Sequence, residues 1–106
     1  MHAVLITFTS SAPLSDLHAP FSEYAEALTG VPGLIMKTWI HDGSTVGGFH
    51  LFESRAAADR YLGGDLCATV LNNPSFGAFE VRHFDVIDDF SALDGSPVAP
   101  SFASLR

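Results

Sequence analysis

The sequence predicts an α+β fold in which strands and helices follow the order β-α-β-β-α-β. A short run rich in β-branched and aromatic residues, Val4 to Thr9, opens the chain as a buried strand. Two later segments repeat their apolar residues at helical spacing, and Asp42-Gly43 joins two extended runs. Asp-Gly between extended runs is the strongest short-range signal of a β-hairpin, because both turn residues tolerate positive φ.

The first helix is predicted from Ser15 to Thr29. Ser15 is a suitable N-cap, Gly30 follows the end, and Pro20 is expected to bend the helix because it lacks a backbone N–H donor. Its apolar residues recur at helical spacing: Leu17, Phe21, Tyr24, Ala25 and Leu28.

The hairpin is predicted to pair Leu34–His41 with Ser44–Glu53 across a two-residue turn. This register sets Trp39 opposite Val46, Lys37 opposite Gly48 and Ile35 opposite His50. One face then carries Lys37, Trp39, His41, Gly48, His50 and Phe52. The other face is almost wholly apolar, with Leu34, Met36, Thr38, Ile40, Gly47, Phe49 and Leu51. A hairpin that is apolar on both faces has to be covered on both.

A second helix begins after the N-cap Ser54, stops at Gly63-Gly64 and restarts over Asp65–Leu71. The last strand is predicted from Phe79 to Ile87. This order is that of ferredoxin-like folds, a four-stranded antiparallel sheet with both helices on one face.

Residues 1–90 should therefore form one ferredoxin-like domain. The sheet face that the helices leave bare predicts a homodimer. The tail 91–106 is expected to pack on the body or on the dimer partner.

Composition limits the function. The chain is 47% hydrophobic with nine Phe, more apolar material than one small core needs. Its net charge of −7 argues against partners that are nucleic acids or membranes, whose phosphates it repels. The lone Cys67 and an N-terminus without a signal-peptide pattern predict a cytoplasmic protein.

Several short motifs resemble, in order and spacing, the YdhR-type monooxygenases of the dimeric α+β barrel superfamily. They are Pro32-Gly33-Leu34, Lys37-x-Trp39, the run from Gly47 to Phe52, the helix from Arg55 to Ala58 leading to Tyr61-Leu62, and Phe84-Asp85-Val86. The resemblance covers residues 3 to 93 approximately and implies two subunits with their sheets face to face. It also implies a pocket in each subunit, between the sheet and its own helices. In relatives such pockets oxidise polycyclic aromatic compounds or haem, or host non-redox steps.

The candidate site lies on the hairpin face that carries His50. His50 is the candidate general base, because histidine has an unperturbed pKa of ~6.5. Lys37 and Trp39 would stabilise the resulting anion, by charge and by an indole N–H. Phe52, Tyr61 and His41 are candidate substrate-binding residues.

Structural roles compete with these assignments. His50 could be a core histidine satisfied by a hydrogen bond, Trp39 a packed core aromatic, and Lys37 a partner to a carboxylate across the dimer. Cys67 lies on an apolar helix face and is more simply an inert buried thiol. No close metal-ligand pair, phosphate-binding loop or reactive-cysteine context occurs, so no metal and no cofactor are expected.

The predicted function is a cofactor-independent monooxygenase, with a hydrophobic aromatic or polycyclic substrate and molecular oxygen as partners, in secondary metabolism. One alternative is a non-redox cyclase or isomerase that uses the same pocket. Another is a dimer that binds a small molecule without turnover, which is favoured if Trp39, Phe52 and Tyr61 themselves fill the pocket.

Overall fold

The computed structural model describes residues 1–87, and within them it shows the predicted ferredoxin-like α+β fold. The elements are β1 (His2–Ser10), η1 (Leu14–Leu17), α1 (His18–Leu28), β2 (Leu34–Asp42), β3 (Thr45–Phe52), α2 (Arg55–Leu62), α3 (Asp65–Leu71) and β4 (Phe76–Asp85). The four strands form one antiparallel sheet in the order β2-β3-β1-β4.

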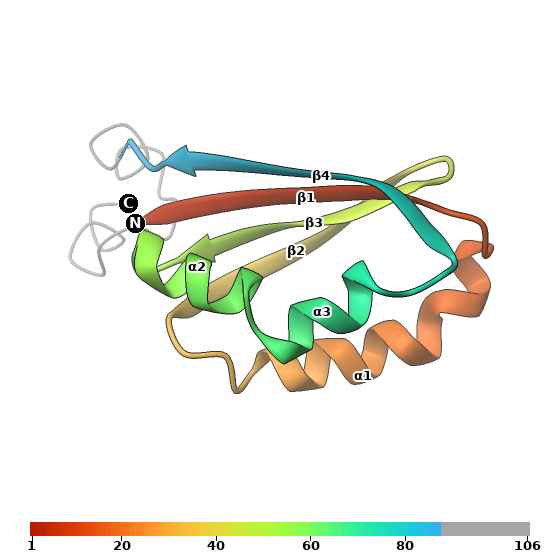
Figure 1. Ribbon diagram of the computed structural model, residues 1–106, viewed down its shortest axis with the longest axis horizontal. Coiled ribbons are helices and arrows are strands. Elements are labelled where there is room, and N and C mark those ends of the chain that lie inside the picture. Colours follow the sequence, from red (N-terminus) through yellow and green to blue (C-terminus); the bar gives the residue numbers. More distant parts are fainter. Residues whose placement is uncertain (88–106) are drawn as a thin grey trace, which may run out of the picture.

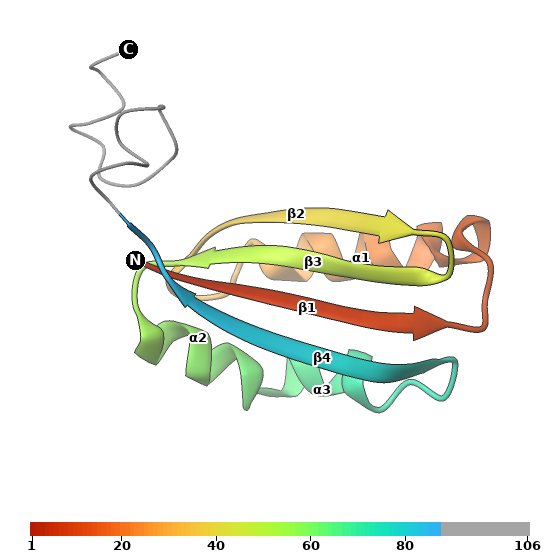
Figure 2. The same cartoon turned by 90° about the horizontal axis from the view of Figure 1, so that it is seen from above.

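The molecule has two layers, a sheet and a layer of helices that covers one of its faces (Figure 1). Figure 2 shows α1 behind β2 and β3, and α2 with α3 along the side of β4. The core lies between the layers, where every second residue of β1 points toward the helices. Its buried members include Val4, Ile6, Phe8, Tyr24, Leu28, Val46, Phe52, Ala58, Tyr61 and Cys67.

The predicted hairpin exists, but its turn and register differ from the prediction. Asp42 pairs with Thr45, so Gly43 and Ser44 form the turn, with Gly43 at a φ of 60°. Trp39 therefore pairs with Gly48, and Lys37 with His50. Asp42 extends the strand, because glycine at the first turn position takes the positive φ more readily than aspartate. Because the shift is two residues, the side chains from Met36 to His41 keep their predicted faces. Leu34 does not: an irregularity between Leu34 and Met36 pairs Leu34 with Phe52, and Leu34 packs against the core.

The first helix also starts differently from the prediction. The segment opens as the 3₁₀ helix η1, Ser15 lies inside it, and no side chain caps α1. α1 runs through Pro20, which falls in its first turn, where backbone N–H groups have no helical acceptor, so the proline removes no helical hydrogen bond. The expected bend at Pro20 stays a prediction.

The second helical region and the last strand follow the prediction more closely. The Ala57 N–H donates to Ser54 Oγ at 3.1 Å, which confirms the cap, and Gly63-Gly64 separate α2 from α3. β4 begins at Phe76, three residues earlier than predicted, and ends at Asp85. None of the helices within residues 1–87 has the length and apolar character needed to cross a membrane.

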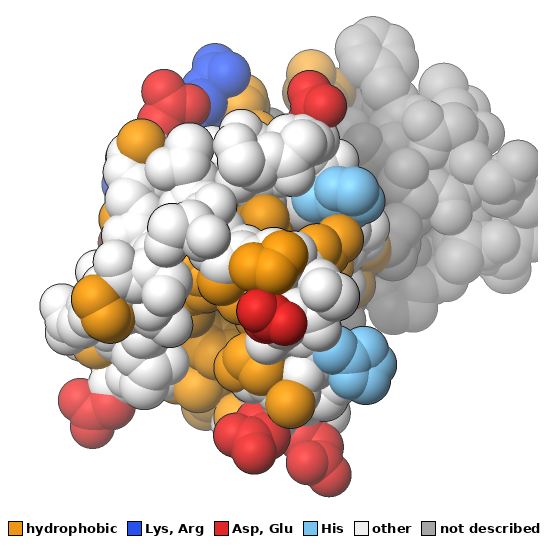
Figure 3. Space-filling model, turned by 90° about the vertical axis from the view of Figure 1, so that its right-hand side faces the viewer, with side chains coloured by type: hydrophobic (Ala, Val, Ile, Leu, Met, Phe, Trp, Pro, Cys, Tyr) orange, Lys and Arg blue, Asp and Glu red, His pale blue; other side chains and the backbone are white. Residues whose placement is uncertain are grey.

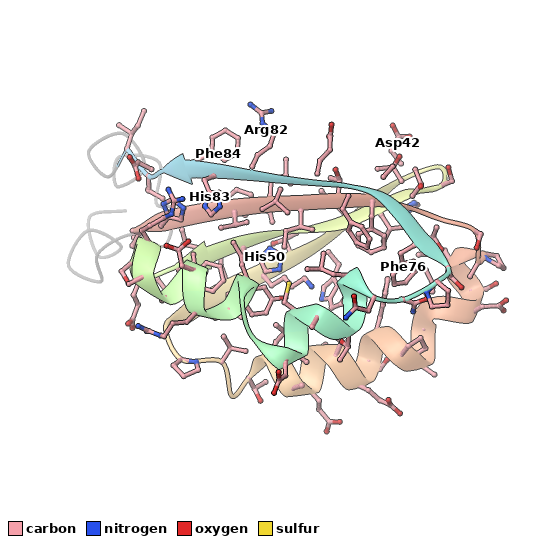
Figure 4. All side chains as sticks on the ribbon, in the orientation of Figure 1. Asp42, His50, Phe76, Arg82, His83 and Phe84 are labelled. Carbon is pink, nitrogen blue, oxygen red and sulfur yellow. The ribbon has the colours of Figure 1, made fainter. Side chains whose placement is uncertain are left out.

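The second face of the sheet carries no helix in the described chain. Phe49 and Phe84 are 37% and 39% exposed on it. Figure 4 shows Phe84 and Arg82 on this side of β4, while His50 and Phe76 lie on the side of the helices. The predicted packing of the tail 91–106, and the domain boundary at residue 90, fall outside the described residues.

Candidate active site

His50 lies on β3 beneath the helices, with only 1% of its surface exposed. Its Nδ1 lies 3.1 Å from the carbonyl oxygen of Val4 on the paired strand β1, so Nδ1 carries the hydrogen and donates it. That tautomer leaves a lone pair on Nε2. Nε2 is buried and has no hydrogen-bond partner among the described residues. A buried nitrogen with a free lone pair is unusual in a folded protein and marks a site that can accept a proton.

Lys37 lies directly across from His50 on β2. Its Nζ is 3.6 Å from the centroid of the Trp39 ring and 4.8 Å from that of Tyr24. Gly48 makes room for this side chain, since a Cβ at Gly48 would lie 2.5 Å from Lys37 Cε. Within residues 1–87, no carboxylate forms an ion pair with Lys37. Aromatic faces therefore hold the ammonium, through cation–π attraction.

Two tyrosines and the lone cysteine complete the cluster. The hydroxyls of Tyr24, from α1, and Tyr61, from α2, are hydrogen-bonded at 2.5 Å, and Cys67 of α3 lies near Tyr61. Burial raises the pKa of Tyr24 to about 12, and it raises the pKa of Tyr61 as well. Burial also raises the pKa of the Cys67 thiol. All three groups therefore keep their protons at neutral pH.

Burial acts in the opposite direction on the two basic groups. It lowers the pKa of His50 to about 4, assisted by the charge of Lys37. It lowers the pKa of Lys37 to about 8. Near pH 7 the site thus holds a neutral imidazole beside an ammonium ion. An anion placed between them would favour protonation of His50, so the imidazole becomes a stronger base when such an anion forms.

Several cavities adjoin this cluster, and two of them share both Phe21 and Trp39. The inner cavity, of about 30 Å³, is lined by Lys37, Gly48, His50, Tyr24, Tyr61 and Cys67 among others. The outer pocket, of about 370 Å³, lies between the start of the helical layer and the hairpin and is lined by Leu14, Leu17, His18, Phe21, Ser22, Ala25, Trp39, Ile40, His41 and Val46. Phe21 and Trp39 line both. At the end of the molecule seen in Figure 3, hydrophobic side chains gather in a hollow with acidic and histidine side chains around it.

The structure brings four of the six predicted site residues together. Lys37, Trp39, His50 and Tyr61 all line the inner cavity. His41 lies apart, in the outer pocket. Phe52 is fully buried and lines neither cavity; its ring packs 6.1 Å from His50 and 5.6 Å from Tyr61, so it supports both rings from behind.

Sequence reasoning does not select Tyr24 or Cys67 as site residues. The sequence pattern places Tyr24 only in the apolar stripe of the first helix and indicates an inert thiol for Cys67. A usable signal does exist, because a buried tyrosine hydroxyl generally requires a hydrogen-bond partner. Which residue supplies that partner depends on how α1 and α2 pack, since Tyr24 and Tyr61 are far apart in the chain.

Residues 1–87 contain no group of three or more His, Cys, Asp or Glu side chains placed to share a metal ion. His2 Nε2 and His83 Nδ1 lie 2.7 Å apart, a separation at which they share a hydrogen bond.

Solved structures of the same fold include several oxygenases. SnoaB of Streptomyces nogalater, described as a cofactor-independent oxygenase, is 13% identical, with a TM-score of 0.66 over 80% of this chain and 91% of that one. A protein from Deinococcus radiodurans, described as a putative antibiotic biosynthesis monooxygenase, is 13% identical, with a TM-score of 0.66 over 81% and 92%. NE2512 of Nitrosomonas europaea, of unknown function, is 18% identical, with a TM-score of 0.63 over 81% and 88%. At these identities the similarity establishes the fold.

No protein with curated annotation matches the sequence significantly. A family model does match, over residues 4–97, which is nearly the whole chain. The expected resemblance is confirmed: the chain belongs to the family described as "Putative mono-oxygenase ydhR".

Proposed function

We propose that the protein is a cofactor-independent monooxygenase that acts on an aromatic or polycyclic small molecule, in secondary metabolism. One observation carries the proposal: His50, whose buried Nε2 has a free lone pair, lines the same small cavity as Lys37. Membership of a family described as mono-oxygenases supports it, as does the fold shared with SnoaB.

The chemistry requires a substrate that becomes reactive toward oxygen when it loses a proton. A phenol or an enolisable ketone bound in the outer pocket would pass its acidic proton toward His50 Nε2 through one water. Lys37 would stabilise the anion, and Trp39, which lines both cavities, would orient the ring. One atom of dioxygen enters the substrate and the other leaves as water. The electrons come from the substrate carbon, which changes from a methylene to a carbonyl, so no external reductant is needed.

The proposal includes a homodimer formed by the two bare sheet faces. Leu5, Phe49 and Phe84 present apolar surface there, and Arg82 lies over the Phe84 ring at 5.0 Å. A second copy would bury these side chains and remove the cost of exposing them to water. The lone Cys67, buried as a thiol, is consistent with a reducing cytoplasm.

Oxygen uptake tests the assignment. An oxygen electrode should record consumption when the protein is mixed with anthrone, whose enol form is a polycyclic phenol, without added flavin, haem or metal. His50→Ala should lower turnover by ~10²-fold or more, the usual worth of a positioned base. Trp39→Phe should slow the rate while preserving the packing.

His83→Ala is the matched control, because His83 lies outside both cavities. Normal turnover by folded His50→Ala would overturn the assignment of the base.

Binding without turnover is the second candidate, because Trp39 and Tyr61 already fill most of the space around His50 and leave about 30 Å³. It predicts saturable binding of the same compound with no chemical change in air. A cyclase or isomerase would instead convert its substrate equally well under strict anaerobiosis. Anaerobic and aerobic product analysis therefore separates the three functions.

A further inference from the structure

We infer that the inner cavity is a separate binding site for one small monoanion, held by Lys37 and His50, while the organic substrate occupies the outer pocket. In the turnover proposed above this anion is superoxide, and that identification rests on the proposed function. The site itself does not, because it follows from the size, charge and hydrogen bonding of the cavity.

Size separates the two ligands. A volume of about 30 Å³ is enough for a molecule of water size or slightly larger. Pockets for drug-sized ligands start at roughly 300 Å³, a size that the outer pocket reaches with about 370 Å³. A polycyclic compound therefore fits beside His41 and Trp39 but not beside His50. Phe21 and Trp39 form the shared wall, so the two ligands would be neighbours.

Charge determines which small molecule is favoured. The Lys37 ammonium lies over two aromatic rings and has no anionic partner among residues 1–87. Lys37 is half-buried, and a cation partly removed from water is costly unless an anion or a set of acceptors compensates it. The neighbouring titratable groups are Tyr24 on α1, Tyr61 on α2, Cys67 on α3 and His50 on β3. None of them is ionised at neutral pH, so a bound anion would be the counter-ion of Lys37.

His50 adds a proton requirement. Its Nδ1 is committed to Val4, so Nε2 carries a lone pair, which would repel an anion bound beside it. If Nε2 takes up a proton, it becomes a donor and attracts the anion instead. Anion binding should therefore be coupled to protonation of His50. Above the pKa of His50, which is about 4 in the free protein, affinity should fall about tenfold per pH unit.

The same coupling balances the proposed reaction. The proton that leaves the substrate is held at His50 Nε2, and the substrate anion transfers one electron to dioxygen. The resulting superoxide lies between Lys37 and protonated His50, beside the substrate radical. When the two radicals combine, a carbon–oxygen bond forms, and the proton on Nε2 passes to the terminal oxygen of the hydroperoxide.

Azide, a small monoanion, tests the site without turnover. The full-length protein is titrated with sodium azide at constant ionic strength, and the His50 ring ¹⁵N signals are followed by NMR. Trp39 fluorescence provides a second signal, since Trp39 is the only tryptophan. We expect saturable shifts toward a protonated ring and an affinity that weakens about tenfold per unit from pH 6 to 8. Sulfate, which is too large, should give no saturable shift.

Two variants assign the effect to Lys37. Lys37→Met keeps the length of the side chain and removes its charge, so azide binding should be lost. Arg60→Met removes an exposed cation on α2 and is the matched control. If Lys37→Met does not fold, Gly48→Ala tests the role of Lys37 instead. Its methyl group would displace Lys37 from the cavity, so azide binding should weaken at least tenfold.

Failure of the site and failure of the proposed function are distinguishable. Absence of saturable shifts, unchanged binding in folded Lys37→Met, or direct competition between azide and anthrone would overturn the separate anion site. Azide binding with no oxygen uptake would leave the site standing and remove the monooxygenase. Oxygen uptake without azide binding would support the monooxygenase and remove the separate anion site.

Discussion

The two faces of the sheet have similar hydrophobic character but different surroundings. The covered face carries Val4, Ile6 and Phe8 under the helices, and polar groups lie among them, chiefly Lys37 and His50. The bare face carries Leu5, Phe49 and Phe84, and its polar residues, such as Arg82, reach solvent. Alternation along the strands separates these sets, since neighbouring residues point to opposite sides.

The difference shows where chemistry and where assembly can take place. Polar groups on the covered face are removed from water, so their pKa values shift and their lone pairs stay unoccupied. Apolar groups on the bare face have no pKa values to shift. What they can contribute is the free energy gained when they are buried against another surface. Changes on each face should therefore affect different measurements.

The largest effect is expected from a charge on the bare face. Phe49→Asp should convert the proposed dimer into a monomer, because an unpaired carboxylate buried in an interface costs about 3–5 kcal/mol. This corresponds to a dissociation constant raised by roughly 10²- to 4 × 10³-fold. Analytical ultracentrifugation measures it. Ala56→Asp, on an exposed position of α2, is the control and should leave the dimer intact. A monomeric wild-type protein at micromolar concentration would contradict the assembly.

The next largest effect is expected in how the free energy of unfolding depends on pH, through His50 on the covered face. The pKa of His50 is about 4 in the folded protein and ~6.5 in the unfolded chain. Between these values the unfolded chain binds a proton that the folded protein does not, so the free energy of unfolding rises with pH. Acidification from pH 6.5 to 4 should cost up to about 3 kcal/mol.

Urea unfolding at several pH values measures this slope, and His50→Met should flatten it. Burial also lowers the pKa of His83, which adds to the slope in the same direction. His83→Gln is therefore needed as a parallel control. An unchanged slope in His50→Met would show that His50 is not held neutral by the fold.

A smaller effect concerns the tyrosine pair beneath the helices. Tyr61→Phe should lower the free energy of unfolding by about 1–3 kcal/mol, because the buried Tyr24 hydroxyl loses its partner. The double variant Tyr24→Phe/Tyr61→Phe should recover part of that loss, since no orphaned hydroxyl remains. Denaturant unfolding of the full cycle gives the coupling energy, and strictly additive losses would argue against a hydrogen bond between the two residues.

The smallest effect is expected at the start of α2, which holds Tyr61 over the sheet. Ser54→Ala should cost about 1 kcal/mol, because the Ala57 N–H loses its acceptor. Ser22→Ala is the control: its hydroxyl bonds only to the His18 carbonyl within α1, so little should change. Thermal unfolding compares the two variants, and equal losses would indicate that the cap is not specific.

Local pattern by itself determined the order of the elements, the cap at Ser54 and the break at Gly63-Gly64. These features depend on neighbouring residues, whose propensities and turn preferences can be interpreted directly. The face that carries Lys37, Trp39 and His50 was also predictable, because strand alternation survives a register shift of two residues. The register itself was not, because Gly43-Ser44 and Asp42-Gly43 are both acceptable turns.

Only the tertiary structure decided how the site is built. It orients Nδ1 of His50 toward Val4, a residue of another strand, and thereby leaves Nε2 free. It brings Tyr24 to Tyr61 across two helices and divides the space around Trp39 into an inner cavity and an outer pocket. These properties depend on distances between segments far apart in the chain and on the volume left after the side chains pack. A residue pattern contains neither, because cavities, desolvation and pKa shifts arise only once the two layers are in contact.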